Sequence, residues 1–133
     1  MPGRGIIAAM KNSPASPAIT LFGIPHCDTV KKARLWLQDQ GLAYQFHDFK
    51  RDGVPADALA RWMQAVGWEA LLNRKGTTWR MLDAAVQARV QDGASAAALM
   101  RAQASVIKRP VVQWPDGRVT VGFTPQGFAQ LLA

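Results

Sequence analysis

The order of strand-like and helix-like segments restricts the fold of this chain more than any other feature. Residues 19–23 form an apolar, strand-like run, residues 29–40 carry apolar side chains at helical spacing, and residues 42–49 alternate as a strand does. Asp28 or Thr29 is suited to cap the start of the helix. Two neighbouring strands joined through a helix form a parallel pair with a right-handed crossover. The first part of the chain therefore predicts a β-α-β unit.

The last part of the chain predicts a hairpin followed by a helix. Two strand-like runs, residues 111–114 and 118–121, are separated by Pro-Asp-Gly at residues 115–117, which is typical of a tight turn between antiparallel strands. Thr124 and Pro125 are residue types favoured at the N-cap and the first position of a helix, so we expect a closing helix from there.

A helical insert is predicted between these two halves, over about residues 54–106. Gly67 and Gly93 are expected to act as breaks, and Asp83 and Ser95 as caps, which divides the insert into four or five short helices. The whole pattern predicts an α/β, thioredoxin-like fold, in which a mixed four-stranded sheet has flanking helices and an inserted helical subdomain.

The chain length and the N-terminal composition predict one domain behind a tail. Residues 1–18 contain three prolines, two glycines and two serines, and their apolar patch at residues 6–10 is too short for a secretory signal. No later segment approaches the roughly 20 apolar residues of a membrane helix. We therefore expect a disordered tail over residues 1–18, a single domain over residues 19–133, and a monomeric protein without a membrane anchor.

The charge of the chain favours anionic partners without naming one. Lys and Arg number 16 against 9 acidic residues, which gives a formal net charge of +7. Such an excess attracts anions in general. Nucleic-acid binding would need clustered basic residues interleaved with exposed aromatic side chains, and here the basic residues are scattered in pairs. We therefore do not predict a nucleic-acid interface, and no residue spacing predicts a metal site.

Cys27, the only cysteine, lies between the first strand and the first helix. At a helix N-terminus, unpaired backbone N–H groups and the helix dipole favour an anion and lower the pKa of a thiol. His26 precedes the sulfur, and Lys31 follows within the first turn and can add positive charge. The alternative is that Cys27 is a small buried hydrophobic residue. A single cysteine fits a reducing cytoplasm, and any disulfide chemistry needs a second sulfur from another molecule.

Three separated blocks resemble the arsenate reductase/Spx superfamily, most closely its YffB-like branch, over about residues 18–133. The blocks are GIPHCDTVKKA at residues 23–33, LLNRKGTTWR at residues 71–80, and IKRPV at residues 107–111 followed by Gly122-Phe123. The resemblance implies a thioredoxin-like fold with a helical insert and a cytoplasmic thiol reductase. It further implies that no cofactor is bound, that glutathione is the co-substrate, and that the substrate is a small oxidised compound or an oxyanion.

The resemblance also assigns roles to individual residues. Cys27 matches the nucleophilic cysteine, Arg109 the arginine that precedes the active-site proline, and Pro110 that proline, which is cis in the family. Arg74 lies within about a residue of an insert arginine that faces the anion. Guanidinium groups stabilise developing negative charge, and a proline leaves the neighbouring strand edge free for a peptide-like ligand such as glutathione. With His26 beside the sulfur, these residues form the expected binding site.

Two departures from the family pattern keep an alternative open. Arsenate reductases of this group carry another arginine at the end of the last strand, where this chain has Val121-Gly122-Phe123. Redox-switch members of the Spx branch have a second cysteine three positions after the first, where this chain has Val30. An intramolecular redox switch is therefore impossible. The alternative to a reductase is a non-enzymatic, Spx-like regulatory module that binds a protein partner such as RNA polymerase.

Overall fold

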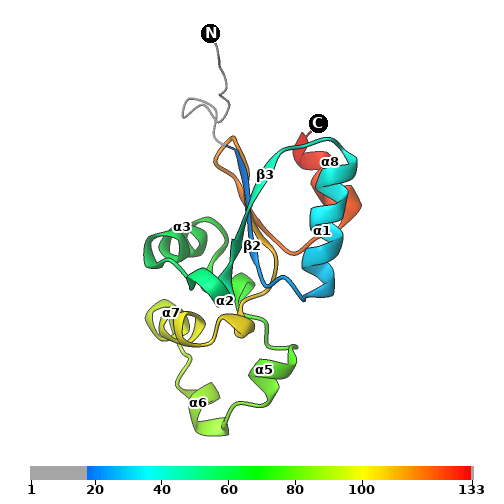
Figure 1. The fold of residues 1–133 in the computed structure, drawn as a ribbon. Coiled ribbons are helices and arrows are strands. Elements are labelled where there is room, and N and C mark those ends of the chain that lie inside the picture. Colours follow the sequence, from blue (N-terminus) through cyan, green and yellow to red (C-terminus); the bar gives the residue numbers. More distant parts are fainter. Residues whose placement is uncertain (1–17, 133) are drawn as a thin grey trace.

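The computed structural model describes residues 18–132, which form a four-stranded mixed sheet with helices on both faces (Figure 1). The strand order is β3-β2-β4-β5. Strand β2 (Ile19–Gly23) is parallel to β3 (Tyr44–Asp48) and antiparallel to β4 (Val111–Gln113), which in turn pairs antiparallel with β5 (Val119–Val121). The predicted mixed sheet and the predicted hairpin are confirmed. The tail predicted at residues 1–18 lies outside the described residues, apart from Ala18.

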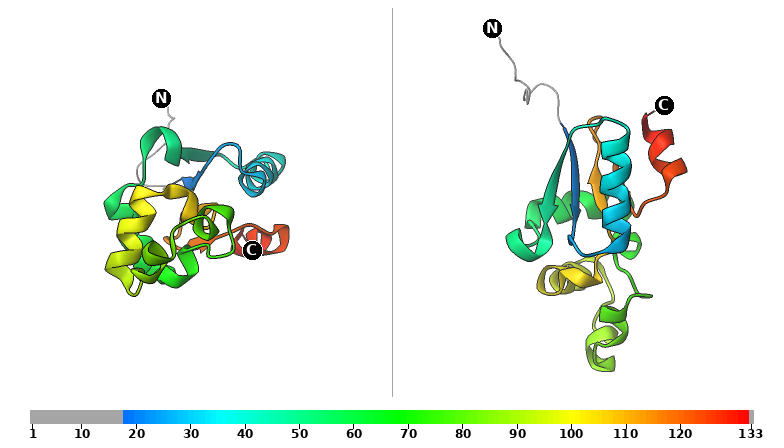
Figure 2. Two further views of the ribbon diagram at one scale, coloured as in Figure 1. Left: turned by 90° about the horizontal axis from the view of Figure 1, so that it is seen from below. Right: turned by 45° about the vertical axis from the view of Figure 1, so that its right-hand side comes forward.

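The two faces of the sheet are covered by different helices (Figure 2). Helices α1 (Asp28–Asp39) and α8 (Pro125–Leu132) cover one face, and α3 (Ala56–Val66) lies over the other, with α7 (Gly93–Ala102) packed against α3 on the same side. Alternation along each strand divides the core in the same way. In β2, for example, Leu21 belongs to the cluster beneath α1 and α8, whereas Phe22 belongs to the cluster with α3 and α7.

The insert contains five short α-helices, as the sequence predicts. Besides α3 and α7, these are α4 (Trp68–Leu71), α5 (Thr77–Arg80) and α6 (Ala84–Ala88), followed by the 3-10 turn η1 (Ala104–Val106). No helix among residues 18–132 is long and apolar enough to cross a membrane.

Three details of the predicted element boundaries are wrong. The second strand ends at Asp48 because the Asp48 carboxylate accepts a hydrogen bond from the Lys50 N–H at 2.9 Å and starts the helical turn α2 (Phe49–Asp52). Ser95 is not the N-cap of α7. Gly93 is not a break between two helices either, because it is the first residue of α7. Asp92 is the cap, since its carboxylate accepts from Ser95 N at 2.9 Å while the Ser95 hydroxyl faces the Asp92 N–H in a capping box.

The third correction concerns the start of α1, where Cys27 itself occupies the N-cap position that the sequence assigned to Asp28 or Thr29. The turn before it begins directly after β2, and Cys27 N donates to Ile24 O at 3.1 Å. Cys27 has extended backbone angles (φ −76°, ψ 126°), and its carbonyl accepts the first intrahelical bond, from Lys31 N at 2.9 Å. Cys27 is therefore itself the residue that begins the helix, directly before its first turn.

The insert is tied to the sheet at two places. The fully buried Trp62 of α3 donates its indole N–H to Oε1 of Gln113 in β4 at 3.0 Å. Further along, Leu72 and Ile107 form an antiparallel bridge, and Lys108 N donates to Leu71 O at 2.7 Å. This bridge brings the chain after α4 beside the segment that leads into β4, next to the N-terminus of α1.

Candidate active site around Cys27

The Cys27 sulfur lies at the N-terminus of the twelve-residue helix α1 and is half-buried. The short turn from β2 fixes this position, because it has only four residues between the end of the strand and the start of the helix. Four backbone N–H groups at a helix N-terminus have no partner within the helix. The N–H groups of Val30 and Thr29 are directed at the sulfur and lower the pKa of the Cys27 thiol.

Arg109 supplies the cation that acts on the Cys27 thiol. Its Nη1 donates to the carbonyl oxygens of Ser105 at 2.9 Å and Ile107 at 3.1 Å, which anchors the side chain to its own segment. Its Nε is buried and donates to no acceptor among residues 18–132. The following peptide bond to Pro110 is cis, as the family resemblance implies, and Pro110 O accepts from Gly122 N at 2.8 Å. The Arg109–Pro110 segment is thereby joined to the end of β5.

The net effect of these surroundings is to lower the pKa of the Cys27 thiol. Partial burial acts in the opposite direction and raises the pKa, and it is the largest single contribution. The Val30 N–H, the guanidinium of Arg109 and the Thr29 N–H together outweigh it, because each of them stabilises the thiolate. Such a thiol is more readily ionised than a free cysteine, and the thiolate is the nucleophilic form.

A pocket of about 490 Å³ opens in front of the sulfur. It is formed by the start of α1, the loop after α4, the segment before β4 and the link from β5 to α8. Its nine lining residues include two cations and no carboxylate, and they are Cys27, Thr29, Asn73, Lys108, Arg109, Val121, Gly122, Phe123 and Thr124. A ligand that approaches the sulfur therefore meets a positively charged wall, which favours anions.

The structure brings together only part of the predicted site. Cys27 and Arg109 line the pocket, and Pro110, which does not line it, joins the lining residues Arg109 and Gly122 through the chain and the hydrogen bond to Gly122 N. His26 and Lys31 are exposed and do not line it. Arg74 does not line it either, because its guanidinium carbon lies 5.6 Å from the ring centroids of both Trp68 and Trp79. The roles predicted for these three outer residues stay predictions.

Several pocket residues were missed by the sequence analysis, chiefly Asn73 and Lys108. Both are neighbours of an arginine that was singled out, and only the Leu72–Ile107 bridge shows that they face the same space. Lys108 reaches the backbone of Gly122, where a Cβ would lie 3.7 Å from the Lys108 Cε. Gly122 has a φ of 86°, which only glycine adopts without strain. The Lys-Arg-Pro run did mark this segment as part of the site. It did not show that the Lys108 side chain lines the pocket.

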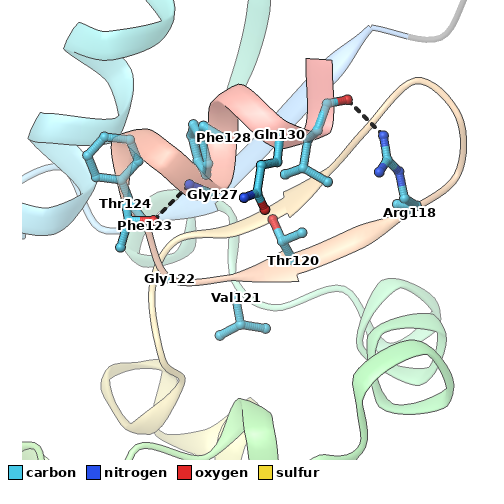
Figure 3. A pocket seen from close by; sticks show the side chains of 10 residues that line it. Arg118, Thr120, Val121, Gly122, Phe123, Thr124, Gly127, Phe128 and Gln130 are labelled. Carbon is cyan, nitrogen blue, oxygen red and sulfur yellow. Dashed lines mark hydrogen bonds between the residues drawn. The ribbon is translucent and has the colours of Figure 1, made fainter. Parts of the chain in front are cut away.

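A second, smaller hollow of about 310 Å³ adjoins this pocket (Figure 3). It lies between β5 and α8 and shares the four-residue stretch Val121–Thr124 with the Cys27 pocket. Arg118 lines one end of it, and its Nη2 donates to Leu131 O at 2.7 Å (Figure 3). Its inner end is fixed by the Thr124 hydroxyl, which accepts from Gly127 N at 2.9 Å as the cap of α8. The sequence prediction of this cap is confirmed.

The fold is thioredoxin-like, with a cysteine at the start of its first helix and an arginine before a cis-proline. These features define a class of thiol proteins. Comparison with known proteins identifies the family. The ArsC family model matches residues 22–131. An uncharacterized protein of Haemophilus influenzae is 36% identical over 115 residues, which is 86% of this chain and 99% of that protein. The chain belongs to the ArsC family.

Solved structures agree with this assignment. A YffB protein is 50% identical, with a TM-score of 0.81 over 86% of this chain and 99% of its own. A protein of Brucella melitensis described as related to arsenate reductase is 48% identical, with a TM-score of 0.68 over 90% of this chain and 98% of its own. Arsenate reductase from Vibrio cholerae is 20% identical, with a TM-score of 0.70 over 86% and 98% of the two chains, and shares the fold.

Proposed function

We propose that this protein is a glutathione-dependent thiol reductase that uses the Cys27 thiolate as its nucleophile. The observation that carries the proposal is the position of the sulfur, at the N-cap of α1 and beside Arg109, in an open pocket with no acidic lining residue. Because the thiol pKa is lowered, more of the reactive thiolate is present at neutral pH.

Glutathione is proposed as the second thiol because the chain has no other cysteine. Once Cys27 has formed a disulfide, only a thiol from another molecule can release it. Glutathione carries carboxylates at both ends, which suits a pocket that contains two cations. This proposal places the protein in a reducing compartment such as the cytoplasm, where glutathione is kept in its thiol form.

The proposed reaction is a pair of thiol–disulfide exchanges. The Cys27 thiolate attacks the glutathionyl sulfur of a mixed disulfide, a new S–S bond forms, and the substrate sulfur leaves as a thiolate. A glutathione thiolate then attacks the glutathionyl sulfur bound to Cys27. Glutathione disulfide is released, and Cys27 returns to its thiolate form. One free glutathione is consumed in each cycle, the other half of the glutathione disulfide is the glutathionyl group taken from the substrate, and the substrate leaves as a thiol. Arg109 stabilises the Cys27 thiolate at the start and the end of the cycle.

Oxidised sulfur compounds and oxyanions are the proposed substrate classes. The end of β5 carries Gly122 rather than an arginine, and this favours a disulfide over arsenate, since an oxyanion loses one guanidinium contact there. A mixed disulfide with glutathione brings its own carboxylates to the cationic wall and does not depend on that contact.

The first test is the alkylation rate of the intact chain with iodoacetamide as a function of pH. Because Cys27 is the only cysteine, the reaction reports this thiol alone. The rate is expected to rise through a midpoint below the ordinary cysteine pKa of about 8.5, since the folded protein stabilises the thiolate. Reduced glutathione is expected to slow the reaction by occupying the pocket.

The second test is turnover of a glutathionylated peptide with reduced glutathione, compared in the wild type and Cys27→Ser. Loss of all turnover above the uncatalysed rate in Cys27→Ser supports the reductase. An ordinary thiol midpoint together with no turnover by the wild type would overturn it. That result would favour the alternative, a non-enzymatic module in which the same fold binds a protein partner. Arsenate tested in the same assay distinguishes the two substrate classes.

A further inference from the structure

Lys108 is a second cation at the Cys27 pocket, and it occupies a different part of it from Arg109. It lines the pocket next to Gly122, where its Cε lies 3.7 Å from the position that a Cβ would take. The glycine leaves this space open, so the lysine stem lies across the end of β5. Gly122 also belongs to the stretch Val121–Phe123, where the family resemblance leads to an arginine that this chain lacks. The pocket wall is therefore charged at this point by a side chain from another segment.

The main chain of Lys108 is fixed while its ammonium group remains available. Its N–H donates to Leu71 O at 2.7 Å, and the preceding residue forms the bridge with Leu72. Three ion pairs occur among residues 18–132, and none of them involves Lys108. The residue is exposed, and no lining residue of the pocket is acidic. A lysine with a fixed main chain and an unpaired side-chain charge at an open pocket is suited to bind an anionic group of a ligand.

The two cations of the pocket do different things. Arg109 is anchored on two carbonyl groups and stabilises the thiolate. Lys108 is not among the groups that act on the thiol. A change at Lys108 is therefore expected to alter ligand binding and to leave the reactivity of the sulfur itself unchanged.

We propose that Lys108 binds a carboxylate of the peptide thiol or disulfide that reacts with Cys27, and so selects anionic, glutathione-like compounds over uncharged ones. This inference rests on the proposed function and extends it to the recognition of the co-substrate. Arg109 keeps its place beside the reacting sulfur atoms, and Lys108 holds the ligand further along the wall, beside Gly122. It is a specificity residue, not a group that takes part in the exchange of sulfur bonds.

The test measures how fast two disulfides modify Cys27, one anionic and one uncharged. Glutathione disulfide carries four carboxylates, and bis(2-hydroxyethyl) disulfide carries none. In each reaction the Cys27 thiolate forms a mixed disulfide and one thiolate leaves, so mass spectrometry of the intact chain follows both in the same way. The variants are Lys108→Gln, Lys108→Arg, and Lys50→Gln as a control. Lys50 is an exposed lysine of α2 outside the pocket, so its variant changes the net charge by the same amount.

Lys108→Gln is expected to slow glutathione disulfide about fivefold, the size of effect typical of one partly exposed ion pair. The uncharged disulfide should react at the wild-type rate within about twofold. Lys108→Arg should restore most of the rate, and Lys50→Gln should change neither reaction. The difference between the two disulfides should also shrink as salt is added, because salt screens an exposed pair.

Two failures can be told apart. If neither disulfide modifies Cys27 in the wild type, the proposed reductase function fails and the role of Lys108 fails with it. If both disulfides modify the wild type, but Lys108→Gln slows both equally or neither, the reductase stands and only the role of Lys108 is overturned.

Discussion

The segment before β4 and the loop after α4 each carry an arginine that the sequence analysis placed at the site, and the structure treats the two differently. Arg109 donates to two backbone carbonyls and lines the Cys27 pocket. Arg74 lies over two indole rings, is exposed, and does not line the pocket. The two segments are bridged side by side at Leu72 and Ile107, so proximity alone does not decide which arginine serves the thiol.

The difference between Arg109 and Arg74 shows that the groups contacting a guanidinium determine whether its charge lies in the pocket. Carbonyl oxygens hold the Arg109 guanidinium close to its own main chain, where it acts on the Cys27 thiol. Indole faces attract the Arg74 guanidinium through their quadrupoles, at the surface of the insert. One arginine thus lines the pocket and lowers the pKa of the Cys27 thiol, and the other packs on the indole rings of the insert.

The largest expected effect is on the free energy of unfolding. It tests whether the insert and the sheet unfold together, because the comparison of Arg109 with Arg74 assumes that the two regions are packed as one unit. Trp62→Ala should lower the free energy of unfolding by about 3–5 kcal/mol, because a fully buried indole is lost and a cavity remains. Trp62 also packs on Phe22 of β2, with ring centroids 4.7 Å apart, so the variant removes a contact between the insert and the sheet. Urea denaturation followed by circular dichroism measures it.

A milder variant keeps this prediction testable if Trp62→Ala does not fold. Trp62→Phe retains most of the apolar contact but leaves Oε1 of Gln113 without its donor, which should cost about 1–3 kcal/mol. The wild type and Trp62→Phe should each unfold in one transition. Two separate transitions would mean that the insert folds on its own, and the position of Arg74 would then say nothing about the pocket.

The next largest effect should come from Arg109→Gln. Removing the guanidinium takes away a charged partner of the thiolate, so the Cys27 pKa should rise and transfer to a disulfide at neutral pH should fall about tenfold. The alkylation midpoint should move to higher pH in the same variant. Arg109→Lys is the informative companion, because it keeps a positive charge but replaces the planar guanidinium, whose Nη1 donates to both carbonyls, by a single ammonium nitrogen. If Arg109→Gln reacts as the wild type does, the cation beside the sulfur has no chemical role.

The sequence predicted the sheet better than it predicted the site. The β-α-β and hairpin patterns follow from local periodicity, and the closing helix follows from Thr124, whose hydroxyl caps it as expected. Boundaries were wrong where a side chain competed with the backbone, as Asp48 does when it ends β3 early. Cys27 was placed correctly at a helix start, but its N-cap position was not foreseen, because cysteine is not a residue type that capping preferences favour.

The rest of the site depends on contacts that no local pattern encodes. Asn73 and Lys108 meet in the pocket only because two segments about 35 residues apart pair through a single bridge. Motif position favoured Arg74 over Asn73, although the latter is the residue that faces the sulfur side of the loop. The direction of a side chain within a loop is set by its partners in space, here the indoles of Trp68 and Trp79.

The smallest expected effect is that of Arg74→Gln, and it is the sharpest test of the comparison. If Arg74 belongs to the packing of the insert, the variant should alkylate and exchange disulfides at the wild-type rate within about twofold, with the same midpoint in pH. Its free energy of unfolding should fall by about 0.5–1 kcal/mol, because an exposed cation–π contact is worth that much. Arg80→Gln is a matched control, since Arg80 is an exposed arginine of the same insert that lies outside the pocket. A tenfold loss of disulfide transfer in Arg74→Gln, with Arg80→Gln unchanged, would show that Arg74 leaves the indoles and enters the pocket when a ligand binds. The two arginines would then share one role, as the sequence pattern predicted.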